Sequence, residues 1–169
     1  MSLDKSNIIS EREIKSIHLW MSKMKRYKDL SLEEKISKCK RRLKLNYKVI
    51  GNGKHRIVYD LNNGYVLKVA ITNWGVENNK TEFDMYTNCP RQLRNNLCPV
   101  KEHGEGWIIM NKVDTNTPVD SKYKKKLRQL KKEFIENGIN PKDMWRENLA
   151  LSEEMEIIVI DYGNFHKID

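Results

Sequence analysis

The chain has 169 residues, of which 38% are hydrophobic and 33% are charged, and its formal net charge is +9 at pH 7. This composition excludes wholesale disorder and predicts one folded domain, or a small domain with two lobes. No apolar run approaches the roughly 18 residues of a membrane span, and the opening sequence MSLDKSNIIS lacks the apolar core of a signal peptide, so we expect a cytoplasmic protein that does not contact a membrane.

Cysteine and histidine spacing argues against several classes of site. The three cysteines, Cys39, Cys89 and Cys98, include no C-x-x-C pair, so we expect reduced thiols and neither a disulfide framework nor a zinc site. The four histidines are widely separated, and no G-x-S-x-G or H-E-x-x-H motif occurs. Metalloprotease and serine-hydrolase functions therefore have no support.

Two helix-start signals stand in the first 45 residues. SERE at 10–13 and SLEE at 31–34 are capping boxes, in which the serine and the glutamate side chains satisfy each other's backbone N–H groups. Apolar residues follow each box at helical spacing. We therefore expect two helices before residue 46.

The pattern then changes to that of strands. Residues 46–71 contain three β-rich runs separated by GNGKH and NNG, and the second separator favours a hairpin turn. Residues 77–89 have the spacing of a helix, and residues 97–113 contain two further strands around Gly104 and Gly106. The predicted order is three strands, a helix and two strands.

A breaker-rich linker at 115–120 precedes a lysine-rich helix from Ser121 to Asn137. Its apolar positions fall on one stripe and leave the lysines outside, which favours a solvated helix face over a nucleic-acid footprint, although both remain open. Two short strands should follow, one near 148–151 and one at 157–160.

Four motifs occur in a characteristic order along these elements. GNGKHRIVY lies at 51–59, YVLKVA at 65–70, PKDMWRENLAL at 141–151 and IIVIDYGNF at 157–165. Together they resemble the protein-kinase-like family, and in particular small atypical bacterial or phage-type kinases. The resemblance implies an α+β, two-lobed fold. It would comprise an N-terminal helical extension (1–45), a lobe with a five-stranded antiparallel sheet and one helix (46–113), and a reduced helical C-lobe (114–169).

In the N-lobe, the resemblance assigns Gly51 and Gly53 to a glycine-rich loop that covers nucleotide phosphates. Lys68 would bind the α- and β-phosphates and form an ion pair with Glu82, for which Glu77 is the fallback. A lysine at a sheet edge that faces water is the alternative for Lys68. Four further positions would contact the nucleotide, namely Val58, Met110, Asn111 and Val113.

In the C-lobe, the resemblance assigns Asp143 as the base that accepts the proton of the attacking hydroxyl. Asn148, five positions later, and Asp161 of the DYG motif would hold Mg²⁺ on the nucleotide. The implied activity is an ATP- and Mg²⁺-dependent phosphotransferase, a protein (serine/threonine) or small-molecule kinase whose acceptor is unknown.

Several departures from the family pattern keep other functions open. Arg56 replaces the third glycine of the loop, Pro141 and Lys142 replace His and Arg, and only Tyr162 to Asp169 follow Asp161. We therefore expect a small C-lobe, completed by the N-terminal helices, a protein partner or a second copy. The alternatives are a nucleotide-binding regulator without activity (a pseudokinase) and a basic nucleic-acid-binding protein.

Overall fold

The computed structural model describes residues 5–113 and 120–168, so residues 115–119 of the predicted linker lie outside it. The chain divides into two compact units. Unit 1 comprises Met1–Asn79 and Val100–Lys112, and unit 2 comprises Lys80–Pro99 and Val113–Asp169. The three-part division expected from the sequence stays a prediction.

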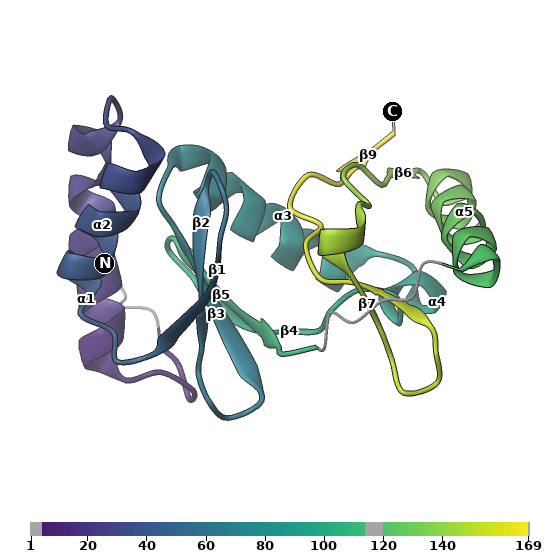
Figure 1. Cartoon of the computed structure of the whole chain (residues 1–169), viewed down its shortest axis with the longest axis horizontal. Coiled ribbons are helices and arrows are strands. Elements are labelled where there is room, and N and C mark those ends of the chain that lie inside the picture. Colours follow the sequence, from purple (N-terminus) through teal and green to yellow (C-terminus); the bar gives the residue numbers. More distant parts are fainter. Residues whose placement is uncertain (1–4, 114–119, 169) are drawn as a thin grey trace. The chain divides into compact units, whose positions relative to one another are not determined.

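Unit 1 begins with two helices that lie side by side along one face of a sheet (Figure 1). The helices begin after Ser10 and Ser31, and both predicted capping boxes are present, which confirms the two sequence signals. A short 3₁₀ turn separates them. The bounds are Glu11–Met24 for α1, Lys25–Tyr27 for η1 and Leu32–Leu43 for α2.

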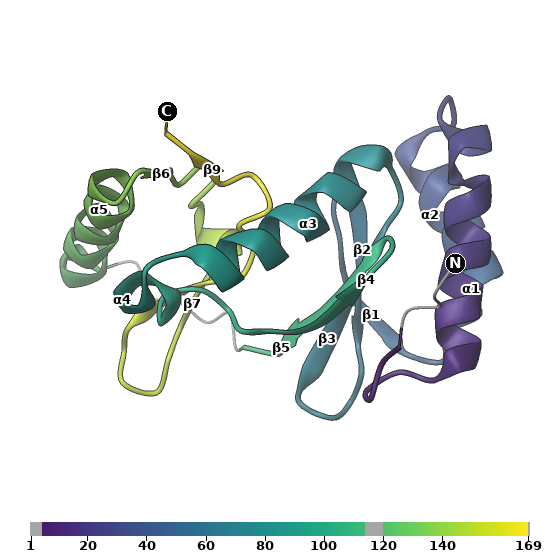
Figure 2. The ribbon, with the colours of Figure 1, turned by 180° about the vertical axis from the view of Figure 1, so that it is seen from behind.

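The sheet of unit 1 has five antiparallel strands, which confirms the predicted five-stranded antiparallel sheet, and their order is β1-β2-β3-β5-β4 (Figures 1 and 2). The strands are β1 Lys48–Asn52, β2 Arg56–Asp60, β3 Tyr65–Ala70, β4 Val100–Gly104 and β5 Trp107–Asn111.

The helix between β3 and β4, α3 (Asn73–Asn88), begins four residues earlier than the sequence pattern predicts. The Thr72 hydroxyl accepts a hydrogen bond from the Gly75 N–H at 3.2 Å, so a threonine cap satisfies a backbone group of the first turn. This cap lacks the glutamate of a capping box and was therefore missed in the sequence.

The core of unit 1 lies between the sheet and the N-terminal helices. Alternate strand residues, including Leu67 and Val69, pack in one cluster with Ile17 and Trp20 of α1. The Trp20 indole N–H also donates to the backbone oxygen of Ala70 at 2.8 Å, which satisfies a polar group within this core. Burial of this sheet face by α1 and α2 is the main apolar stabilisation of unit 1.

The N-terminal helices pack on the sheet of unit 1, and the expectation that they complete a small C-lobe stays a prediction. Their buried apolar residues belong to the core cluster of the unit 1 sheet. The close approach of Gly106 to Met21 supports the same conclusion, because a Cβ built at that glycine would lie 2.2 Å from the methionine sulfur. These helices are part of unit 1.

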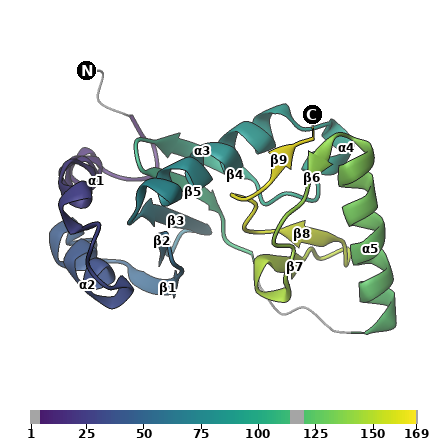
Figure 3. The ribbon, with the colours of Figure 1, turned by 90° about the horizontal axis from the view of Figure 1, so that it is seen from above.

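Unit 2 contains the long helix α5, the β7–β8 hairpin and a short β6–β9 pair (Figure 3). The helix and the hairpin were predicted, whereas α4, η2 and the β6–β9 pair were not. Tyr123, Leu130 and Phe134 are buried on one stripe of α5. The bounds are α4 Arg91–Arg94, α5 Ser121–Glu136, β6 Ile139–Asn140, η2 Arg146–Asn148, β7 Leu149–Leu151, β8 Ile157–Val159 and β9 His166–Lys167.

Within 5–113 and 120–168, no helix is long and apolar enough to cross a membrane. All three cysteines are buried and form no disulfide bond, and their reduced state stays a prediction.

We predict that Gly75→Ala destabilises the protein by about 1–3 kcal/mol, because an added Cβ would lie 2.2 Å from the backbone oxygen of His55. Alanine improves helix propensity by at most about 1 kcal/mol, so the steric conflict should dominate. Urea unfolding would measure the change. Gly53→Ala is the control, since open space surrounds that position, and equal stability of both variants would contradict the prediction.

Candidate functional site

Several predicted nucleotide-binding residues lie on one face of the unit 1 sheet. Residues directly opposite each other in an antiparallel pair share a face, and residues two apart on a strand do so too. Gly51 lies opposite Val58, Val58 lies opposite Lys68, and Lys68 lies opposite Ile108, two residues before Met110. The side chains of Val58, Lys68 and Met110 therefore point away from the face that α1 and α2 cover, and Gly51 lies on the same side.

Lys68 lies in the centre of this face. Its strand, β3, pairs with β2 on one side and β5 on the other, and the lysine is only 5% exposed. This position excludes the alternative of a sheet-edge lysine facing water. Because burying an ammonium group is costly without compensating interactions, the position indicates a role for this charge.

The backbone of the β1–β2 hairpin does not require glycine at positions 51 and 53. Neither has a positive φ. A Cβ at Gly51 would meet nothing closer than the 3.7 Å contact with Val58, and at Gly53 it would meet nothing within 4 Å. The fold thus leaves open space at Gly53, and at Gly51 it would allow a Cβ in ordinary van der Waals contact with Val58.

The base of this hairpin is fixed to the start of α3. The His55 backbone oxygen accepts a hydrogen bond from the Ile71 N–H at 2.8 Å, and its ring Nδ1 lies 3.0 Å from the Thr72 hydroxyl. Burial, followed by the nearby charges of Lys54, Arg56 and Lys35, lowers the pKa of His55. Arg56, which replaces the family's third glycine, is buried and donates to the Asn79 side-chain oxygen at 3.1 Å.

In unit 2, the exposed side chain of Asp143 is held by two hydrogen bonds. The Asn164 side-chain nitrogen donates to one carboxylate oxygen at 2.5 Å, and the Trp145 indole N–H donates to the other at 3.3 Å. The backbone of Asp143 has a φ of 60°, a left-handed conformation that aspartate tolerates better than most residues. The carboxylate is thus oriented while it remains accessible to solvent.

Asn148 is joined directly to this loop. Its side-chain nitrogen donates to the backbone oxygen of Asp143 at 2.8 Å, which leaves the amide oxygen to act as an acceptor or a metal ligand. The Asn148 backbone oxygen accepts from the Ile160 N–H at 2.9 Å, immediately before Asp161. Asp143, Asn148 and Asp161 are therefore connected within unit 2.

The donor set of Asn148 and Asp161 suits a magnesium ion carried by a nucleotide. Mg²⁺ prefers oxygen ligands and commonly takes one or two carboxylates together with substrate phosphates. Across the described residues, no group of three or more His, Cys, Asp or Glu side chains could hold a metal ion. An amide and one carboxylate fit a shared protein and phosphate site.

The tyrosine of the DYG motif is a core residue. Tyr162 is fully buried, its hydroxyl donates to the Cys98 backbone oxygen at 2.8 Å, and its N–H donates to a Glu82 carboxylate oxygen at 3.2 Å. Burial, followed by the charge of Glu82, raises the pKa of the Tyr162 phenol. The contact between the DYG backbone and Glu82 was not predicted from the sequence.

The predicted residues are divided between the two units. The expected Lys68–Glu82 ion pair stays a prediction. Trp145 and Asn164, which hold the Asp143 carboxylate, were missed; the only sequence signal was their closeness to the two motifs. Unit 1 holds Gly51, Gly53, Val58, Lys68, Met110 and Asn111, and unit 2 holds Glu82, Val113, Asp143, Asn148 and Asp161.

Comparison with protein-family profiles gives no match for this sequence, and comparison with curated proteins gives none either. Solved structures do match. A medium-resolution structure of the bifunctional kinase-methyltransferase WbdD has a TM-score of 0.57 at 17% identity, over 69% of this chain and 31% of that one. A high-resolution structure of WbdD gives 0.59 and 17%, over 73% and 34%.

A third structure, of WbdD with the kinase inhibitor LY294002, gives a TM-score of 0.57 at 16% identity, over 75% of this chain and 34% of that one. The chain thus spans about a third of the length of the chains it matches. At this level of identity the likeness concerns the fold. Together with the sheet order and the helix between β3 and β4, it shows that the chain has a protein-kinase-like fold.

Proposed function

We propose that this chain is an ATP- and Mg²⁺-dependent phosphotransferase. The observation that carries the proposal is the common sheet face of Gly51, Val58, Lys68 and Met110. Together they provide a loop that a ligand can approach closely, apolar side chains for contact and a buried cation. A nucleoside triphosphate presents the matching groups, since it has phosphates and a flat apolar base.

Each residue of this face has a role in binding ATP. Lys68 stabilises the negative charge of the α- and β-phosphates, and the absence of a Cβ at Gly51 and Gly53 lets the backbone of the β1–β2 hairpin approach them. Val58 and Met110 contact the adenine. The backbone of Asn111 and Val113 supplies hydrogen bonds to its edge.

Unit 2 supplies the groups that act on the acceptor and the metal. Asp143 orients the acceptor hydroxyl and takes its proton, a role that suits an accessible carboxylate with both oxygens already positioned. Asn148 and Asp161 hold Mg²⁺, which when bound neutralises charge on the phosphates. Phosphoryl transfer depends mainly on such positioning and charge stabilisation.

A second candidate function is nucleotide binding without turnover. Arg56 favours it, because this residue stands where the family has the third glycine of the loop. Its side chain is buried and donates a hydrogen bond to Asn79, so the hairpin departs from the usual family pattern. Under this alternative the chain acts as a pseudokinase. The accessible Asp143 carboxylate favours the active enzyme.

We predict that Asp143→Asn lowers phosphate transfer at least about 100-fold, because an amide cannot accept the hydroxyl proton. Nucleotide affinity should stay within about twofold, since Asp143 contacts the acceptor. Radiolabelled-ATP turnover and titration calorimetry would measure both. Asp84→Asn, at an exposed aspartate of α3, is the matched control. Undiminished transfer by Asp143→Asn would show that another group is the base.

We predict that Asp161→Asn weakens Mg·ATP binding at least about tenfold, because it removes the charged metal ligand. Without Mg²⁺, in EDTA, the variant and the wild type should bind ATP equally. Calorimetric titrations with and without the metal would separate the two effects. An equal loss of affinity under both conditions would instead indicate damage to the nucleotide site.

A further inference from the structure

Four cations form a continuous ridge on α5. Lys122, Lys125, Arg128 and Lys131 follow each other at intervals of three residues, and side chains at this spacing are neighbours on a helix surface. Within the described part of the chain, none of the four forms an ion pair. We call these four residues the basic ridge.

Two other lysines of α5, Lys126 and Lys132, differ from the ridge because carboxylates neutralise them. Lys126 forms an ion pair with Glu156 at 2.7 Å, and Lys132 forms one with Glu136 at 3.5 Å. Apart from Lys124, the cations of α5 that form no ion pair within the described residues therefore lie on the ridge. A helix face that is merely solvated would not require the paired and the unpaired cations to lie at different positions around the helix.

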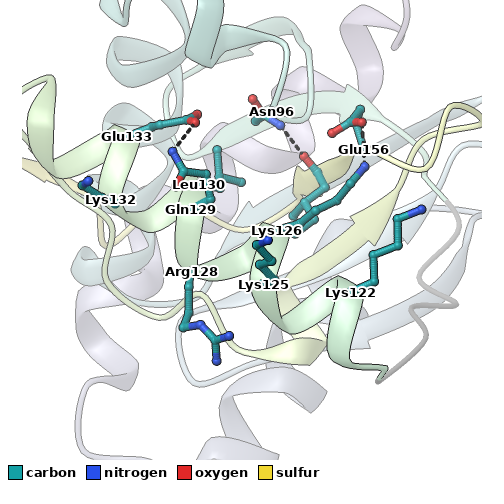
Figure 4. A pocket seen from close by; sticks show the side chains of 11 residues that line it. Asn96, Lys122, Lys125, Lys126, Arg128, Gln129, Leu130, Lys132, Glu133 and Glu156 are labelled. Atoms are coloured by element: carbon teal, nitrogen blue, oxygen red, sulfur yellow. Dashed lines mark hydrogen bonds and ion pairs between the residues drawn. The ribbon is translucent and has the colours of Figure 1, made fainter.

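The ridge borders a groove in unit 2 (Figure 4). The groove has a volume of about 810 Å³, and Lys122, Lys125 and Arg128 line it together with the apolar side chains of Leu130 and Ile157. Figure 4 shows the side chains of Lys122, Lys125 and Arg128 projecting from α5, whereas Lys126 reaches across to Glu156. Anionic groups along the groove would therefore meet cations without breaking existing pairs.

The other end of the ridge reaches an exposed tryptophan beside the proposed base. The Lys131 ammonium lies 5.9 Å from the centroid of the Trp145 ring, and Trp145 is 61% exposed. Its indole N–H donates to the Asp143 carboxylate at 3.3 Å. The ridge, the aromatic ring and Asp143 form one connected surface within unit 2.

This combination selects a ligand that has both negative charges and aromatic rings. Neutral saccharides lack the charge, and acidic peptides offer few flat rings for stacking. Single-stranded nucleic acids have both, and proteins bind them with a basic groove and exposed aromatic side chains. We propose that the basic ridge and Trp145 bind single-stranded nucleic acid, with phosphates along the ridge and a base stacked on Trp145.

A nucleotide on Trp145 would place its sugar hydroxyl near Asp143, which identifies a nucleic-acid hydroxyl as the phosphate acceptor. In this step the hydroxyl oxygen bonds to the γ-phosphorus, the bond from that phosphorus to the β–γ bridging oxygen breaks, ADP leaves with the electron pair, and Asp143 takes the proton. The acceptor assignment rests on the proposed function. The binding surface does not.

The test measures fluorescence anisotropy of 3′-labelled 12-nucleotide single strands of RNA and DNA with the full chain. Lys125→Gln/Arg128→Gln should weaken binding at least about tenfold and reduce the slope of log affinity against log salt by about 1.4. Trp145→Ala should weaken binding at least about fivefold, whereas Trp145→Phe, which keeps a stacking ring, should stay within about threefold.

Lys40→Gln/Arg41→Gln is the matched control, because it removes the same charge from exposed positions of α2. Urea midpoints would show that every variant is folded. Equal weakening by the control, or strand binding that ignores Trp145, would overturn the proposal in favour of non-specific polyanion binding. Heparin, which lacks bases, should bind Trp145→Ala and wild type equally.

A transfer assay with γ-labelled ATP and an unlabelled strand tests the acceptor separately. Label on the strand supports the assignment. Strand binding with turnover of ATP but no labelled strand contradicts the acceptor assignment and leaves the proposed function intact. Strand binding without any ATP binding contradicts the proposed function and leaves the binding surface intact.

Discussion

The alternation of side chains along β3 is the constraint on which unit 1 depends. Leu67 and Val69 face the core that Trp20 completes, and Lys68, between them, faces the opposite side of the sheet. A shift of one residue in strand register would exchange these faces and place an ammonium in the apolar core. The same register that stabilises the fold therefore sets the position of the proposed phosphate-binding cation.

The N-terminal helices and the start of α3 make that register rigid while leaving the hairpin tip open. α1 and α2 cover one sheet face completely enough that Ile17 and Trp20 are fully buried. On the hairpin, the backbone oxygen of His55 is fixed by Ile71, whereas open space surrounds Gly53. A rigid base with an unobstructed tip suits a loop that must approach phosphates closely without a side chain in between.

Local sequence signals predicted most elements, and long-range contacts account for what was missed. The Ser10 and Ser31 boxes and the period-two strands depend on residues close in sequence, so the pattern reveals them. The Thr72 cap has no reciprocal glutamate, and the β6–β9 pair is two residues long, too short for a periodic signal. The Asn164 bond to Asp143 joins residues 21 positions apart and requires the folded chain.

The loop around Asp143 is held more firmly than a surface turn requires. Its backbone oxygen accepts hydrogen bonds from the Trp145 N–H at 2.8 Å and the Asn148 side chain at 2.8 Å, and both carboxylate oxygens accept further bonds. Packing of the loop is supplied by Met144, which is 3% exposed. Trp145 is thus not needed for packing in the core. Exposure of its large apolar ring to water costs free energy, and the stability of the fold does not explain that exposure. A ring that orients the Asp143 carboxylate, the proposed catalytic base, from one edge and stays open to solvent is best explained by a ligand that stacks on it.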